Sequence, residues 1–143
     1  PAAVASGFRL EWFNEGCGGR LTQSEGTLTS PDYPQNYRHD QICIWEIVVE
    51  YGYSVKFTVN DLDIERSQDC QFDSLIVAHD SNFTNYITRI CRTIHESFSF
   101  IAEGHQIFVK FEADESASKR GFNMTYETVE SSKFILKIYQ TFI

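Results

Sequence analysis

Four widely spaced cysteines place the strongest constraint on how this chain can fold. They are Cys17, Cys43, Cys70 and Cys91, and none of them forms a Cys-x-x-Cys pair. A structural zinc site normally needs close pairs of ligands, so this spacing argues against zinc. An even number of cysteines at wide spacing is typical of a disulfide-linked domain from an oxidising compartment. Four cysteines allow three pairings, and spacing alone does not choose among them.

Short runs of alternating apolar and polar residues predict β-strands. In residues 54–59, for example, Val55, Phe57 and Val59 fall on one face and the polar residues between them fall on the other. The same reading predicts strands at residues 42–49, 54–59, 72–77, 97–101, 107–111 and 121–126. No stretch of comparable length carries the caps of a helix. Many short strands separated by turns predict an all-β sandwich or barrel.

Length and composition fit one globular domain with additional ends. The chain has 143 residues, of which 42% are hydrophobic and 15% aromatic, enough to fill a core. Its net charge of -8 argues against nucleic acid or an anionic membrane as partner and favours cations or basic proteins. No apolar run approaches the length of a membrane span, so we expect no direct membrane insertion.

Two glycosylation sequons support an extracellular location. They are Asn82-Phe83-Thr84 and Asn123-Met124-Thr125, so Asn82 and Asn123 are predicted glycosylation sites. The start of the chain has no basic region followed by an apolar segment, and therefore no signal peptide is recognised. We expect the chain to be a piece of a larger secreted or cell-surface protein.

Three carboxylates are candidate ligands for a cation. Glu65 and Asp73 bracket Cys70, and Asp114 comes much later. If folding brings the three together, a hard divalent cation would relieve their mutual repulsion, and calcium is the usual choice outside the cell. Neighbouring acids are expected to be solvated instead, namely Asp63, Asp69 and Glu112.

The sequence offers no catalytic motif. The four histidines have neither the HExxH spacing of a metalloprotease nor a GxSxG nucleophile elbow to act with. We expect them to lie in loops or on the surface, at positions 39, 79, 95 and 105. The chain is therefore predicted not to be an enzyme.

Residues 17–129 resemble a CUB domain, because several motifs of that family occur together and in order. These motifs are Cys17-Gly18-Gly19-x-Leu21, Gly26-Thr27-Leu28-x-Ser30-Pro31-x-Tyr33-Pro34-x-x-Tyr37, Cys43-x-Trp45-x-Ile47, Leu62-Asp63-Ile64-Glu65, Cys70-x-Phe72-Asp73-Ser74-Leu75, Cys91, Phe111-x-x-Asp114 and Gly121-Phe122. The resemblance implies a two-sheet antiparallel jelly-roll sandwich with disulfides Cys17–Cys43 and Cys70–Cys91. One departure is Arg92, where the family usually has glycine after the fourth cysteine, and it puts the local turn in question.

The resemblance also implies a function for the carboxylates. Calcium-binding members of the family use residues that correspond to Glu65, Asp73 and Asp114. Tyr37 would support this site, and Ser116 would add an oxygen. Such sites often bind a Lys or Arg side chain of a protein partner, so Tyr37, Glu65, Asp73 and Asp114 are predicted to contact the partner, with Tyr37 packing along the Lys stem.

The ends of the chain are expected to lie outside this domain. Residues 7–12 echo residues 121–126, so residues 1–16 are predicted to be the tail strand of a preceding CUB-like domain plus a linker. Residues 130–143 form a C-terminal extension of unassigned role. A join this short resembles the tandem arrays of cubilin-like endocytic receptors, in which neighbouring CUB domains would be partners. Two alternatives are a non-catalytic substrate-recognition module of a tolloid-like or complement-type protease, and a structural spacer in a CUB array.

Overall fold

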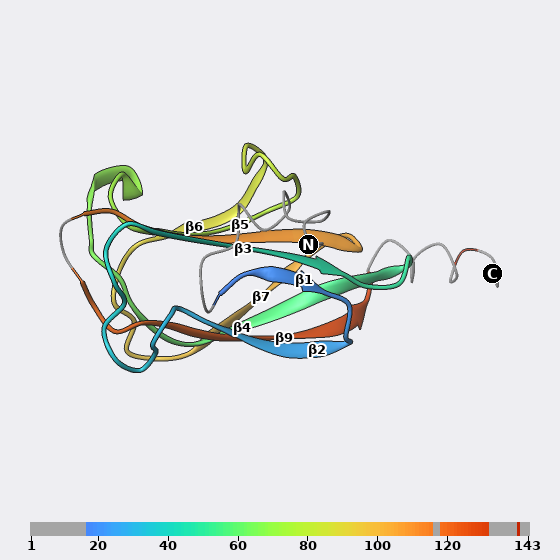
Figure 1. Ribbon diagram of the computed structural model, residues 1–143. Helices are drawn as coiled ribbons and strands as arrows, with labels where there is room; N and C mark the ends of the chain where they lie inside the picture. The colour runs from blue at the N-terminus through green and yellow to red at the C-terminus, as the bar shows by residue number, and fades with distance from the viewer. Residues whose placement is uncertain (1–16, 116–117, 132–139, 141–143) are drawn as a thin grey trace, which may run out of the picture.

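Two β-sheets lie face to face in the computed structural model, which describes residues 17–115, 118–131 and 140 (Figure 1). Among these residues the chain forms nine strands and one short 3-10 turn. They are β1 (Gly19–Leu21), β2 (Glu25–Thr29), β3 (Gln41–Val48), β4 (Tyr53–Asp63), η2 (Gln68–Cys70), β5 (Ser74–Ala78), β6 (Tyr86–Ile90), β7 (Phe98–Ala102), β8 (Gln106–Ala113) and β9 (Gly121–Glu130). No helix in this part of the chain is long and apolar enough to cross a membrane.

The strand order agrees with the predicted two-sheet sandwich. One sheet has the order β1-β3-β8-β5-β6, and the other has the order β2-β9-β4-β7. All neighbours pair antiparallel except β1, which runs parallel to β3. The disulfides are Cys17–Cys43 and Cys70–Cys91, as the family resemblance implied. The first joins the start of the domain to β3, and the second joins the turn before β5 to the residue after β6.

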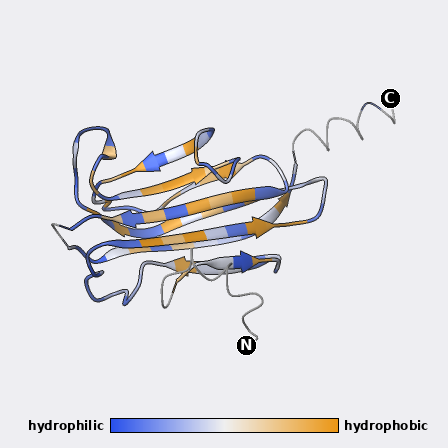
Figure 2. Cartoon of the chain, turned by 45° about the horizontal axis from the view of Figure 1, so that its top comes forward, coloured by the Kyte–Doolittle hydropathy of each residue, from blue (hydrophilic) through white to orange (hydrophobic). Residues whose placement is uncertain are grey.

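Alternating side chains build the core between the two sheets. Figure 2 shows hydrophobic and hydrophilic residues following one another along the strands. In β4 the side chains of Val55, Phe57 and Val59 are completely buried, and in β9 Phe122 and Met124 are buried in the same way. A period of two puts every second side chain on the inner face, so these strands contribute apolar residues to the core and polar residues to the surface.

Six of the nine strands were predicted, with shifted ends. The prediction for residues 72–77 starts too early, because β5 begins at Ser74 and leaves Asp73 in the preceding loop. The other three strands were missed, since β1 has only three residues while β2 and β6 each bury one side chain. The predicted tail strand in residues 1–16 lies outside the described residues. Of the predicted C-terminal extension, Glu130 ends β9, and Ser131 and residue 140 alone of the rest are described.

The proline-containing loop between β2 and β3 closes one end of the sandwich. Its first residue, Ser30, accepts a hydrogen bond from the Phe122 backbone N–H at 3.0 Å through its side-chain oxygen. This close approach leaves no room for a side chain at Gly121, where an added Cβ would lie 1.8 Å from the Ser30 oxygen. Gly121 also has φ of +98°, which side-chain-bearing residues rarely adopt.

Replacing Gly121 with Ala is expected to destabilise the domain much more than replacing Gly104 with Ala. Gly104 has a similar φ of +118°, but an added Cβ there would have no atom within 4 Å. Gly104→Ala therefore costs only the backbone strain, about 1 kcal/mol, while Gly121→Ala adds about 2 kcal/mol or more from the clash. Denaturant unfolding of both variants measures this. Equal losses would show that the contact with Ser30 is unimportant.

Candidate metal centre

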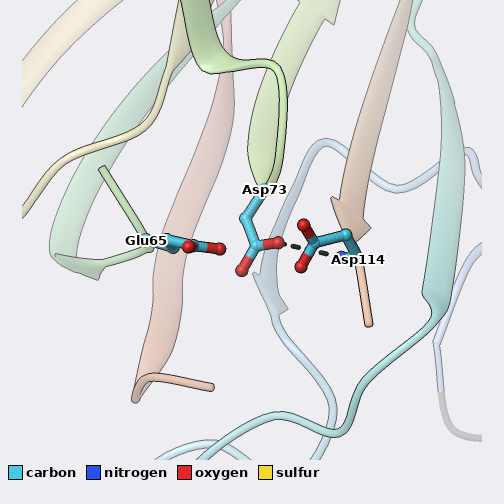
Figure 3. A group of neighbouring side chains, drawn as sticks. All are labelled: Glu65, Asp73 and Asp114. Carbon is cyan, nitrogen blue, oxygen red and sulfur yellow. Dashed lines mark hydrogen bonds between the residues drawn. The ribbon is translucent and has the colours of Figure 1, made fainter. Parts of the chain in front are cut away.

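Three carboxylates from separate parts of the sequence converge at one end of the sandwich (Figure 3). Glu65 follows β4, Asp73 directly precedes β5, and Asp114 directly follows β8. Each offers one oxygen, and these oxygens all lie within 4.8 Å of one another. Strand pairing explains part of this arrangement, because β5 and β8 are antiparallel neighbours and the start of one lies beside the end of the other. The fold thus brings together the three carboxylates that the family resemblance assigned to one site.

Asp73 is the central residue of this cluster. Its side chain is completely buried, and both of its oxygens accept hydrogen bonds. Oδ2 accepts from the Tyr37 hydroxyl at 2.5 Å, and Oδ1 accepts from the Asp114 backbone N–H at 2.8 Å. Burial raises the pKa of the Asp73 carboxyl above its usual value, and these two hydrogen bonds oppose that rise. A bound cation would favour the charged form further.

Tyr37 supports the cluster through its buried ring and the hydrogen bonds of its hydroxyl. Its side chain is only 1% exposed, and its ring packs edge-on against Phe111 with 5.1 Å between centroids. The hydroxyl accepts a hydrogen bond from the Glu65 backbone N–H at 3.4 Å while donating to Asp73. Burial, together with the bond to Asp73, raises the pKa of Tyr37, so the hydroxyl keeps its proton. The predicted packing of Tyr37 along a partner's Lys stem is wrong, because almost none of the ring reaches the surface.

The loop between β8 and β9 runs beside the cluster and is tied to the proline-containing loop. At its start, the Asp114 carbonyl accepts a hydrogen bond from the Asp40 backbone N–H at 2.9 Å. Near its end, the Lys119 carbonyl accepts from the Tyr37 backbone N–H at 2.9 Å, and the Ser118 hydroxyl donates to the Tyr37 carbonyl. Ser116, the fourth predicted ligand, lies in this loop but outside the described residues.

The donor set of the cluster suits a hard cation. The three groups brought together are all carboxylates, and calcium prefers oxygen ligands in a flexible arrangement. The histidines, which would favour a transition metal, are exposed at positions 39, 79, 95 and 105, as expected. A buried acid such as Asp73 also benefits most from a neutralising ion. The residues present therefore fit calcium.

A second polar cluster lies at the same end of the sandwich and was not foreseen from the sequence. The Arg120 guanidinium donates to both oxygens of Asp61 at 2.8 Å, and Tyr33 donates to Asp61 at 2.5 Å. Arg120 also contacts Asp63 at 3.4 Å, and Thr93 donates to Asp63 at 2.9 Å. The prediction that Asp63 is merely solvated is thus wrong. Nothing in the local sequence pairs Asp63 with a residue 57 positions away.

Arg92 does not disturb its turn, although the family usually has glycine there. Its φ is not among the positive values of the described residues, so the position does not require glycine. Its carbonyl accepts a hydrogen bond from the Ile64 N–H at 3.3 Å, and the Ile94 N–H donates to Leu62 at 3.0 Å. This short pairing extends the end of β4. The Arg92 guanidinium lies 5.5 Å from the ring centroid of Phe98.

The contribution of Asp61 to stability is expected to disappear in acid. The hydrogen bonds from Arg120 lower the pKa of Asp61 from 3.8 to about 2 in the folded protein. Because the folded-state value is the lower one, the stabilisation is complete above pH 4 and is lost as the pH falls through 2. Asp61→Asn should cost about 1 kcal/mol at neutral pH, and the difference from the unmodified protein should shrink between about pH 4 and pH 2.

Denaturant unfolding at a series of pH values measures this difference, with Asp69→Asn as the control because Asp69 is exposed. A difference between the Asp61 variant and the unmodified protein that stays constant down to pH 2 would contradict the assignment.

Comparison with known proteins agrees with this architecture. The family model for the CUB domain matches residues 17–126. Canine cubilin is 35% identical over 126 residues, which are 86% of this chain and 4% of that protein. The chain thus spans a small fraction of the curated relatives it matches.

Two solved structures extend the comparison. The full extracellular region of zebrafish Gpr126/Adgrg6 is 31% identical with a TM-score of 0.72, covering 80% of this chain and 15% of that one. The CUB2 domain of MASP-1 bound to Ca²⁺ is 30% identical with a TM-score of 0.66, covering 78% of this chain and 98% of that one. With its two disulfides, the domain is an extracellular one. The chain belongs to the CUB domain family.

Proposed function

We propose that this domain is a calcium-dependent protein-recognition module that binds a Lys or Arg side chain of its partner. The observation that carries the proposal is the convergence of Glu65, Asp73 and Asp114 within 4.8 Å of one another. Acidic residues on a surface are normally kept apart by repulsion, and one of these three is also fully buried. A divalent cation offsets both costs.

Calcium would be held by one oxygen or more from each carboxylate. Six to eight oxygens surround this ion in proteins, so water and main-chain or hydroxyl oxygens of the β8–β9 loop would complete the shell. We include Ser116 in the proposed set because of its place in that loop. The MASP-1 CUB2 domain, whose structure is bound to Ca²⁺, supports the choice of ion.

The partner's basic side chain would meet the exposed part of the cluster. Glu65 and Asp114 are partly exposed, whereas Asp73 is buried and would serve the ion and the loops. A carboxylate that gives one oxygen to calcium can still accept a charge-assisted hydrogen bond from an ammonium or guanidinium. The net charge of -8 would steer a basic partner toward this end of the domain.

The site favours binding over catalysis. All four cysteines are in disulfides, and the group that the described residues bring together contains carboxylates without a histidine. Neither residue type therefore belongs to this group as a nucleophile or base. We propose that the domain has no enzymatic activity of its own.

We propose an endocytic receptor with tandem CUB domains as the parent protein. Similarity to cubilin supports this assignment, with residues 1–16 ending a preceding CUB-like domain and residues 130–143 following this one. Similarity to MASP-1 favours the alternative of a recognition module in a complement-type or tolloid-like protease. In either parent protein, the calcium site would bind a basic side chain of the partner.

Calcium is expected to bind the intact chain saturably, and the double variant Asp73→Asn, Asp114→Asn should lose this binding. The double variant removes two of the three charges while preserving side-chain shape. Titration calorimetry measures the effect, with Glu112→Gln as the control because this acid lies in β8 just before Ala113 but is outside the cluster. Should the double variant unfold, Glu65→Gln alone tests the same point at a partly exposed residue.

The same proteins test the partner chemistry. An immobilised peptide with one lysine should capture the calcium-loaded domain, and its acetylated form should not, because acetylation removes the positive charge. If calcium binds but capture does not depend on the lysine, recognition of a basic side chain is rejected. The alternative of a structural spacer in a CUB array is then favoured. An absence of calcium binding would reject the whole proposal.

We also propose N-linked glycans at Asn82 and Asn123. Asn82 is exposed in the loop between β5 and β6, and Asn123 is partly exposed on the outer face of β9. The mass of the secreted chain before and after enzymatic removal of N-glycans should show two modified sites in the unmodified protein and one in each Asn→Gln variant. Unchanged masses would reject both assignments.

A further inference from the structure

The second polar cluster joins the proline-containing loop to two of the segments that carry the carboxylates, the end of β4 and the β8–β9 loop. We call its members Tyr33, Asp61, Asp63 and Arg120 the anchor cluster. Arg120 is its centre, with two hydrogen bonds of 2.8 Å to the two oxygens of Asp61 and a longer contact of 3.4 Å to Asp63. Its backbone N–H also lies 3.4 Å from Asp63 Oδ2. A two-pronged contact of this kind fixes the orientation of the arginine as well as its position.

Each member of the anchor cluster is close along the chain to a residue of the proposed calcium site or to Tyr37, which supports that site. Tyr33 precedes Tyr37 in the proline-containing loop, and Asp63 precedes Glu65 by two residues. Arg120 ends the loop that begins at Asp114. The anchor cluster thus fastens the far end of that loop, while the Asp114 N–H bond to Asp73 fastens the near end at 2.8 Å.

We propose that Arg120 is a positioning residue for calcium binding, holding the β8–β9 loop against the end of β4. This inference rests on the proposed function, because it assumes that the carboxylate cluster binds calcium. The described hydrogen bonds of Arg120 go to Asp61 and Asp63. When Arg120 already holds the loop in place, the loop loses less conformational entropy as calcium binds. Calcium binding is therefore stronger.

Charge alone makes the opposite prediction for Arg120, which allows a sharp test. A positive group near the site repels calcium, so its removal would strengthen binding if the effect were only Coulombic. Removal of the negative charge of Asp61 would weaken binding on the same view. Loop positioning predicts weaker binding in both cases, since either change breaks the same pair.

The experiment is a calcium titration of the 143-residue chain and of three variants, namely Arg120→Met, Arg120→Lys and Asp61→Asn. Arg120→Met should raise the calcium Kd about tenfold, as loss of an outer contact of a metal site does. Arg120→Lys keeps the charge but not the two-pronged contact, so it should weaken binding by about threefold or more. Arg20→Met is the matched control, because Arg20 forms a surface ion pair of 3.5 Å with Glu46 on β3.

Unfolding in the presence of a chelator separates positioning from general stability. If Arg120 only stabilises the fold, its variants lose the same stability with and without calcium, and the Kd measured on folded protein stays unchanged. That result, or tighter calcium binding by Arg120→Met, would overturn the inference while leaving the proposed function intact. Wild-type affinity in Arg120→Lys would also overturn it. If the unmodified chain does not bind calcium, the proposed function fails, and this inference fails with it.

Discussion

The hydrogen bonds to the buried Asp73 carboxylate hold together the end of the sandwich that carries the candidate site. Removing a charged carboxylate from water costs free energy. Hydrogen bonds from the Tyr37 hydroxyl and the Asp114 N–H offset part of that cost. These two bonds join the proline-containing loop, the segment before β5 and the end of β8. The geometry of the other two carboxylates follows from this central connection.

The sandwich supplies the frame on which the connection depends. β5 and β8 are neighbours in one sheet, so antiparallel pairing places Asp73 and Asp114 side by side. β4 belongs to the other sheet and delivers Glu65 from across the core. The site therefore lies where the two sheets meet at one end, and loops supply its side chains while strands set their positions. Disulfide Cys70–Cys91 links the turn before β5 to the residue after β6, on the same side of the domain.

Two polar clusters of different character occupy this end. The carboxylate cluster concentrates negative charge and suits a cation. In the anchor cluster, the positive charge of Arg120 is balanced by the negative charges of Asp61 and Asp63. This division explains why acids that are close in sequence differ in role. Asp63 and Glu65 are two residues apart, yet one faces an arginine and the other faces two carboxylates.

Local patterns in the sequence determined the class of fold and the chemistry of the candidate site. Alternation in residues 54–59 predicted β4 because a period of two reflects burial of one strand face, and this signal needs no knowledge of the partner strand. Family motifs indicated the disulfide pairing and the three carboxylates. Short strands with a single buried side chain, such as β2 and β6, left no comparable pattern and were missed.

Tertiary structure alone decided how distant residues combine. The burial of Tyr37 contradicted its predicted contact with a partner. No sequence pattern indicated the pairing of Arg120 with Asp61 and Asp63. Periodicity reports whether a side chain faces the core or the solvent. It carries no information about which loop passes over a strand end, because that depends on the packing of segments far apart in the chain.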